Sequence, residues 1–112
     1  MNWIKLNSEK QLDEIVEKSS EKPVMIFKHS TSCSISAMAL DRLERSWNEQ
    51  EVEMDCYYLD LIANREVLNA VADKFAVAHE SPQVLIIKEG ISVFDTSHMG
   101  IRYQSIKGAV AS

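Results

Sequence analysis

Apolar residues occur along the chain in short uninterrupted runs that alternate with segments of helical periodicity. The longest runs have four residues each and cover 24–27, 37–40, 75–78 and 84–87. A continuous run such as 24–27, bounded by polar residues, is typical of a strand buried on both faces of a sheet. Further strands are predicted at 3–6, 54–60 and 91–94, where the last forms a hairpin with 84–87 across a short turn.

Apolar positions at helical spacing predict four helices between and after these strands. Ser8 and Gln11 form a capping box at the start of the first helix. The second begins at Cys33, so that this cysteine lies at a strand-to-helix junction, and Asn64 caps the third. A final helix is expected after 97, capped by Thr96 or Ser97.

The predicted order is β-α-β-α-β-α-β-β-α, and it indicates one α/β domain over 1–112. Parallel crossovers up to the third helix, followed by an antiparallel hairpin, predict a mixed sheet of about five strands with about four helices on its two faces. A chain of 112 residues suits one hydrophobic core.

Charge and hydropathy exclude several classes of partner. The net charge is −5 with scattered basic residues, so nucleic-acid binding is disfavoured. The apolar runs are far shorter than the roughly 20 residues that cross a membrane. The first residues lack the charged and apolar regions of an export signal, and we therefore expect a cytoplasmic protein.

Cys33 and Cys56 are the two cysteines, and the sequence predicts different roles for them. Unpaired amides and the positive end of the dipole at a helix start favour a thiolate, which makes Cys33 a candidate nucleophile with a lowered thiol pKa. Ser36 lies three residues later on the same helix face, from which it could donate a hydrogen bond to the sulfur. Cys56 alternates with apolar residues in a predicted strand and is expected to pack in the core.

The element order resembles the thioredoxin fold over nearly the whole chain. Residues 31–37 read T-S-C-S-I-S-A and occupy the place of the redox loop, while E-S-P-Q at 80–83 occupies that of the facing cis-proline loop. The first of these stretches is similar to the T-C-x-I-S-type loop of the monothiol bacilliredoxins, with Ser34 where proline is more usual. Thioredoxins carry a buried acid six positions before the nucleophile, and this position is Phe27 here.

The resemblance implies a thiol-disulfide oxidoreductase that removes bacillithiol from S-bacillithiolated proteins, with Cys33 and Ser36 as catalytic residues. Because Ser36 cannot form a disulfide, an external thiol must release the mixed disulfide, as in a monothiol carrier. Bacillithiol would be a co-substrate, and no tightly bound cofactor is expected. The expected substrate contacts are Thr31, Ser32, Ser34, Ser81, Pro82, Ser97 and His98.

Two pairs of these expected contacts depend on the predicted local structure. The resemblance implies a cis Ser81–Pro82 bond that offers the Ser81 backbone to an extended substrate. Ser97 and His98 would supply an anion site at the start of the last helix, as glutaredoxins do for glutathione in this fold. Their alternative role is that of an ordinary cap and a surface histidine.

Other readings of the same residues stay open. The chain could be a thioredoxin-like binding module in which the cysteine is incidental, or an iron–sulfur carrier like the monothiol glutaredoxins, although its loop lacks their glycine. No cysteine or histidine pair has zinc-ligand spacing, so no metal site is predicted. Lys28 and His29 are the nearest cationic candidates to the thiolate, with solvated strand-end residues as the alternative.

Overall fold

The predicted strands form one five-stranded sheet in the computed structural model, which describes residues 1–111. The strands are β1 (Trp3–Lys5), β2 (Val24–His29), β3 (Asp55–Asp60), β4 (Gln83–Lys88) and β5 (Ile91–Ser97). Their order across the sheet is β1-β3-β2-β4-β5. The first three neighbours pair in parallel, whereas β4 is antiparallel to β2 and β5 to β4. The sheet is therefore mixed, as predicted.

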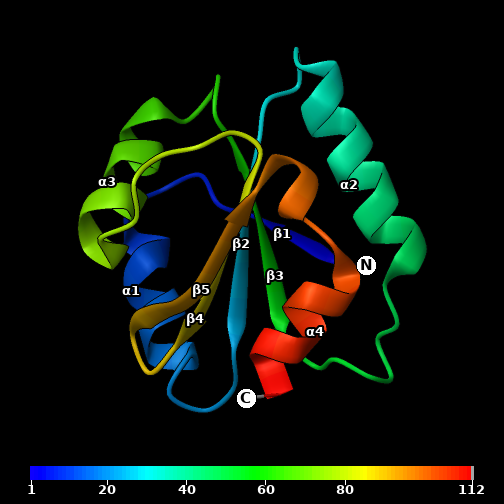
Figure 1. The fold of residues 1–112 in the computed structure, drawn as a ribbon. Coiled ribbons are helices and arrows are strands. Elements are labelled where there is room, and N and C mark those ends of the chain that lie inside the picture. The colour runs from blue at the N-terminus through cyan, green and yellow to red at the C-terminus, as the bar shows by residue number, and fades with distance from the viewer. Residues whose placement is uncertain (112) are drawn as a thin grey trace.

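Helices cover both faces of this sheet (Figure 1). They are α1 (Lys10–Lys18), α2 (Ser34–Ser46), α3 (Arg65–Phe75) and α4 (Tyr103–Ala111), with a 3-10 turn η1 (His98–Gly100) before α4. One core lies between the sheet and α1 with α3, and a second between the sheet and α2 with α4. Within residues 1–111, no helix reaches the length and hydrophobicity that a membrane span requires.

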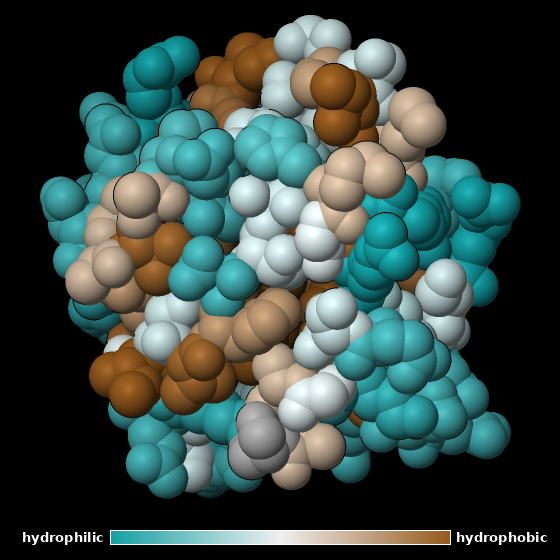
Figure 2. Space-filling view, viewed as in Figure 1, coloured by the Kyte–Doolittle hydropathy of each residue, from teal (hydrophilic) through white to brown (hydrophobic). Residues whose placement is uncertain are grey.

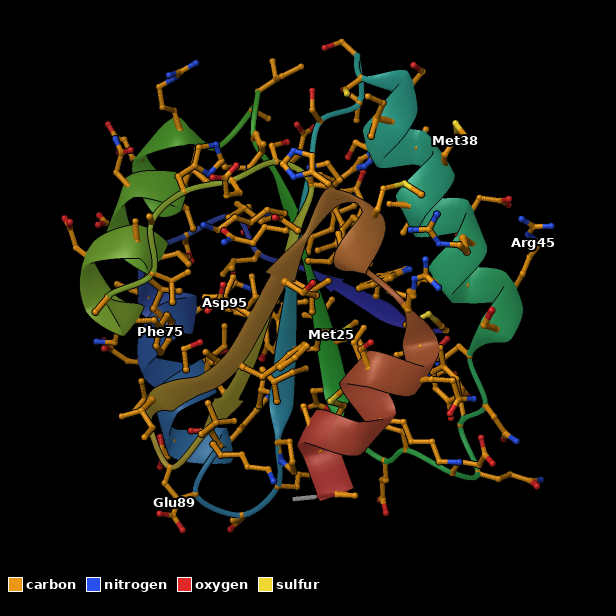
Figure 3. All side chains as sticks on the ribbon, viewed as in Figure 1. Met25, Met38, Arg45, Phe75, Glu89 and Asp95 are labelled. Carbon is orange, nitrogen blue, oxygen red and sulfur yellow. The ribbon has the colours of Figure 1, made fainter. Side chains whose placement is uncertain are left out.

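The apolar run at the start of β2 belongs to both cores because successive side chains of a strand point to opposite faces. Val24 and Ile26 pack in the core under α1 and α3, while Met25 and Phe27 pack under α2 and α4. All four side chains are fully buried, and Figure 3 shows Met25 inside the molecule. Burial of each contributes about 1.5–3 kcal/mol, which holds β2 at the centre of the sheet.

The same alternation continues through the polar end of β2. Lys28 is 0% exposed and follows Val24 and Ile26 toward α1 and α3. His29 is 5% exposed and follows Phe27 toward α2. The solvated strand end considered for both residues is therefore wrong, because β2 pairs with β3 up to His29.

The C-terminal segment differs from its sequence-based prediction. β5 extends to Ser97, because Thr96 and Ser97 pair with Val84 and Gln83 instead of capping a helix. The last helix begins only at Tyr103. Pairing with β4 keeps the backbone of these two residues extended and satisfies its hydrogen-bonding groups within the sheet.

Candidate active site

Cys33 lies at the junction of β2 and α2, as the sequence predicts. It is the N-cap of α2, with an extended backbone at φ −107° and ψ 119°, and its thiol is free and partly exposed. Its amide donates to the Ser30 carbonyl at 3.1 Å, and its carbonyl accepts the first helical bond from the Ala37 amide at 3.1 Å. The sulfur is thus attached where the unpaired amides of α2 begin, and such amides favour an anion.

Ser36 occupies the third position of α2 and is fully buried. Its Oγ lies 2.7 Å from Nδ1 of His29 and accepts a hydrogen bond of 3.1 Å from the Ser30 amide. The sequence predicted that this hydroxyl bonds to the Cys33 sulfur, whereas the hydrogen bonds that the structure shows run to His29 and Ser30. Ser36 therefore ties the end of β2 to the first turn of α2.

His29 is a site residue that sequence reasoning did not place beside Ser36. Its ring lies 6.0 Å from that of Phe27 and 5.4 Å from that of Tyr58, measured between ring centroids. Burial lowers the pKa of His29, while the Asp60 carboxylate and hydrogen bonding with Ser36 act in the opposite direction. The sequence did carry a signal for the position of His29. Side chains of a strand alternate between its two faces, so His29 lies on the same face as Phe27, beneath α2.

The loop before β4 lies at the same edge of the sheet as the Cys33 loop. The Ser81–Pro82 bond is cis, as the resemblance implied. Lys28 of β2 pairs with Gln83 of β4, so the segment after β2 and the segment before β4 begin side by side. The Gln83 side chain donates to the Ala78 carbonyl at 3.1 Å and accepts from an amide of the same loop, which fixes the loop's path.

Ser97 and His98 also lie at this edge of the sheet. They do so at the end of β5 and not, as predicted, at the start of the last helix. Ser97 pairs with Gln83 at the end of β5, and the His98 amide donates to the Pro82 carbonyl at 3.1 Å. Tyr103 begins the last helix, so these two residues do not form its N-terminus, and their role as anion contacts stays a prediction. The two residues are instead neighbours of Pro82, and η1 packs against α2.

The hydroxyl residues around Cys33 face solvent. Thr31, Ser32 and Ser34 are exposed, and the hydroxyls of Ser30 and Ser32 lie 3.3 Å apart. The sequence-predicted contacts of the redox loop are thus accessible to a ligand, unlike the buried hydroxyl of Ser36.

Exposed apolar side chains lie near the same end of α2. Ile35 and Met38 on α2 and Met99 in η1 are 56%, 67% and 67% exposed. Met38 projects away from the sheet in Figure 3, and apolar residues interrupt the polar surface at this end of the molecule in Figure 2. Cys33 therefore lies near exposed apolar side chains, which are typical of surfaces that contact other proteins.

Cys56 lies toward the opposite end of the sheet from Cys33. It pairs with Met25 near the start of β2, four residues before His29, which is about 13 Å along the strand. Two cysteines this far apart cannot form a disulfide without backbone movement. Cys56 is buried in the core under α2 and α4, and burial raises the pKa of its thiol to about 12. The predicted packing role is confirmed.

The Lys28 side chain points to the face of the sheet opposite to the one that α2 covers. On this face, which α1 and α3 cover, the side chain is buried, and among residues 1–111 its Nζ has no hydrogen-bond partner. Burial lowers the pKa of Lys28 from 10.5 to about 8, while the Asp95 carboxylate acts in the opposite direction. Lys28 is thus a buried amine on the far side of β2 from α2.

The structure offers no ready metal centre within the described range. In residues 1–111, no three or more His, Cys, Asp or Glu side chains are grouped in a way that could hold a metal ion. A separate cavity of about 630 Å³ opens at the ends of β1 and β3, lined by Trp3, Lys5, Leu6, Asn7, Tyr58, Asp60, Ala63 and Asn64. Residues of the Cys33 and Pro82 loops do not line this cavity.

Comparison with solved structures confirms the fold. A thioredoxin-fold protein described as a proposed oxidoreductase is 34% identical, with a TM-score of 0.82, covering 96% of this chain and 92% of that one. The thioredoxin of Fasciola hepatica is 18% identical, with a TM-score of 0.69 and coverage of 96% and 95%. The thioredoxin of Malassezia sympodialis is 15% identical, with a TM-score of 0.72 and coverage of 99% and 89%.

A family model identifies the group within this fold. The model described as monothiol bacilliredoxin BrxC matches residues 4–106, which include the Cys33 loop, the Pro82 loop and most of both cores. The family combines a thioredoxin-like fold with a thiol redox role, in agreement with a cysteine at the start of α2. The chain belongs to the monothiol bacilliredoxin family.

Proposed function

We propose that this chain removes bacillithiol from S-bacillithiolated proteins by thiol-disulfide exchange at Cys33. The observation that carries the proposal is the position of Cys33: it is an accessible N-cap thiol beside the Pro82 loop, with a serine three residues later. A C-x-x-C site would hold a second thiol there, whereas Ser36 supplies a buried hydroxyl. The site has one accessible thiol, and that suits a monothiol exchange.

The exchange proceeds in two steps. The Cys33 thiolate attacks the bacillithiol sulfur of the modified protein, the disulfide bond breaks, and the protein thiolate leaves and takes up a proton. Bacillithiol is then held on Cys33 as a mixed disulfide. A second thiol attacks this disulfide, carries bacillithiol away in a new disulfide and returns Cys33 to its reduced form. Bacillithiol is thus a co-substrate, and no resident cofactor is required.

The polar residues around Cys33 are the proposed contacts for bacillithiol, which carries malate carboxylates. Thr31, Ser32 and Ser34 offer exposed hydroxyls or amides on the redox loop. On the other side, Ser81 and Pro82 lie next to Ser97 and His98, as the bond from the His98 amide to the Pro82 carbonyl shows. Donors on both sides of one thiol suit a small anionic ligand.

The protein partner would contact the apolar surface around the nucleophile. Ile35, Met38 and Met99 provide exposed apolar side chains there, and a modified protein must bring its own sulfur to Cys33. We propose that the partners are bacillithiolated proteins in the cytoplasm, where a reducing environment keeps such thiols free. Nucleic acid and membrane are not proposed as partners.

Intact-mass measurement of the reduced protein after incubation with a bacillithiolated protein tests this proposal. Wild type and Cys56→Ser are expected to gain the mass of one bacillithiol while the substrate thiol is released. Cys33→Ser is expected to gain none and to lose essentially all transfer, since Cys56 is buried with a pKa of about 12.

Two results would contradict the proposal. Loss of two hydrogens from the wild type with a Cys33–Cys56 disulfide would show that the monothiol mechanism is wrong. Transfer to neither wild type nor Cys56→Ser, with correctly folded protein, would favour a binding module in place of an enzyme. Visible absorbance of protein purified without oxygen would instead indicate an iron–sulfur carrier.

A further inference from the structure

Another cavity lies between the C-terminal half of α2 and the start of α4. It has a volume of about 550 Å³ and is lined by α2, by the loop after it and by residues 102–104, where α4 begins. The Arg42 side chain of α2 donates to the Ile101 carbonyl, so the two walls are in direct contact. Residues of the Cys33 and Pro82 loops do not line this cavity, and the exchange reaction proposed above does not use it. Its volume is within the range of sites that bind small molecules.

Arg42 has unused hydrogen-bonding capacity at this cavity. A guanidinium has several N–H donors, and Nη2 of Arg42 uses one of them to bond to the Ile101 carbonyl at 2.9 Å. Its Nε atom is buried and, among residues 1–111, has no hydrogen-bond partner. Buried polar atoms in proteins almost always have a partner. The unpaired Nε therefore belongs to a charged group that the protein itself does not fully satisfy.

Arg102 brings a second guanidinium to the same cavity. Its Nε donates to the Met99 carbonyl at 3.2 Å, which leaves its two terminal nitrogens for a ligand. Within residues 1–111, neither Arg42 nor Arg102 forms an ion pair with a carboxylate. The chain as a whole has a net charge of −5, so two arginines without carboxylate partners make this cavity a local site of positive charge.

The carboxylate in the lining does not cancel this charge. Glu51 accepts hydrogen bonds from the Lys107 ammonium at 3.0 Å and from the Tyr103 hydroxyl at 2.8 Å. The bond with Lys107, and after it the one with Tyr103, lowers the pKa of Glu51, so the carboxylate is charged at neutral pH and is paired with Lys107. The first turn of α4 holds no acidic residue, and its free amides also favour an anion.

We propose that this cavity binds a sugar phosphate and that Arg42 and Arg102 hold its phosphate group. A planar guanidinium donates two parallel N–H bonds to phosphate oxygens, and two guanidinium groups match the nearly double negative charge of a phosphate monoester. Ser46, Asn48 and Gln104 line the same cavity and provide the hydroxyl and amide groups that bind sugar hydroxyls. The ligand joins α2 to the segment before α4.

The size and the position of the cavity define this ligand further. Its volume of about 550 Å³ is many times the roughly 30 Å³ that one water molecule occupies, so the cavity has room for more than a bare phosphate ion. Arg42 lies nine residues after Cys33, which is about 13 Å along the helix axis. Binding at this cavity therefore does not require exchange at Cys33.

Isothermal titration calorimetry of the full chain with glucose 6-phosphate tests this site, with inorganic phosphate and glucose as the two comparison probes. The variants are Arg42→Gln and Arg102→Gln, because glutamine keeps hydrogen-bonding capacity and removes the charge. Arg45→Gln is the matched control. Arg45 is also on α2, but it pairs with Asp41 at 3.0 Å, lies outside the cavity lining and projects away from the sheet in Figure 3.

Glucose 6-phosphate is expected to bind the wild type and Arg45→Gln with equal affinity. Each cavity variant should lose about tenfold or more in affinity, the loss that removal of a hydrogen bond between charged groups produces. Inorganic phosphate should bind about tenfold more weakly than glucose 6-phosphate, and glucose should give no heat of binding. Circular dichroism verifies that each variant is folded. Arg102 is exposed, so Arg102→Gln provides the test even if Arg42→Gln, which loses its bond to Ile101, does not fold.

Four results would count against this site. Absence of heat with glucose 6-phosphate and folded wild type would reject it, and wild-type affinity in folded Arg102→Gln would show that the phosphate binds elsewhere. An equal loss in Arg45→Gln would mean that the probe responds only to overall charge. Inorganic phosphate that binds as tightly as glucose 6-phosphate would reject the sugar and leave a site for an adventitious ion only. The probes carry no thiol or disulfide, so these results do not depend on the proposed function.

Discussion

Replacing Ser36 with cysteine is expected to convert the one-thiol site into a dithiol that expels a small thiol from Cys33 about a hundredfold faster, or more. Ser36 is the third residue of α2 and Cys33 its N-cap, the spacing that C-x-x-C motifs place at a helix start. The introduced thiol would attack the sulfur of Cys33 within one molecule. In the wild type, the hydroxyl of Ser36 cannot attack a disulfide, so only an external thiol can release the group bound to Cys33.

The release of a coloured aryl thiolate measures this difference directly. Each protein, in a Cys56→Ser background, is treated with dithiobis(nitrobenzoate), which releases one coloured equivalent as it modifies Cys33. Without added thiol, Ser36→Cys should release a second equivalent rapidly and lose two hydrogens, while wild type and Ser36→Ala retain the adduct. Equal adduct lifetimes in all three would show that the side chains at positions 33 and 36 do not meet.

Replacing Lys28 with methionine is expected to raise the free energy of unfolding at pH 7 by about 2 to 3 kcal/mol. The lysine is 0% exposed in the central strand, and among residues 1–111 its Nζ has no hydrogen-bond partner. Burial lowers its pKa from 10.5 to about 8, so at pH 7 the folded protein holds a charge that water would solvate better. Methionine has a similar length and removes the charge, while Asp95 is exposed and loses little.

This stabilisation should depend on pH in a direction that the lowered pKa determines. Between about pH 8 and 10.5, the unfolded lysine still binds a proton that the folded lysine has released. The free energy of unfolding of the wild type therefore rises with pH in this window, relative to the variant. The advantage of the variant should be complete below pH 8 and should shrink toward pH 10.5.

Urea unfolding of both proteins at several values between pH 7 and 10 gives the two free energies to be compared. Lys22→Met is the matched control, since Lys22 is exposed and its ion pair with Glu53 is long, at 4.0 Å, and it should change stability by less than about 0.5 kcal/mol. A loss of stability in Lys28→Met at pH 7 would mean that the ammonium makes a favourable interaction in the folded protein.

Local patterns in the sequence were sufficient for the elements and for the position of Cys33 at a helix start. The apolar run at 24–27 predicts the central strand because burial on both faces requires it. The capping-box pattern predicts the first helix, and Gln11 accepts hydrogen bonds from the Asn7 and Ser8 amides at 2.8 and 3.1 Å. The predicted cap at Ser8 is wrong, because the N-cap is Glu9 and no side chain caps this helix. Cys33 at a strand-to-helix junction likewise follows from the change in periodicity between neighbouring segments.

The surroundings of the nucleophile depend on contacts between segments that are distant in the sequence. Ser97 at the end of β5 pairs with Gln83 of β4. This strand pairing takes the place of the helix cap that the sequence predicted at Ser97. His98 thereby comes next to Pro82 by a backbone hydrogen bond. Helix-cap preferences are local and weak, whereas pairing with β5 supplies the backbone hydrogen bonds that the buried strand β4 requires.

The sequence by itself determined the order of strands and helices and the position of Cys33, with a serine in place of a second thiol at Ser36, because these follow from periodicity and residue type. Only the tertiary structure decided that Lys28 and His29 are buried on opposite faces of β2. It also decided that Ser36 bonds to His29. Burial and hydrogen bonding of polar side chains depend on which helix covers which face, and that is a property of the packed molecule.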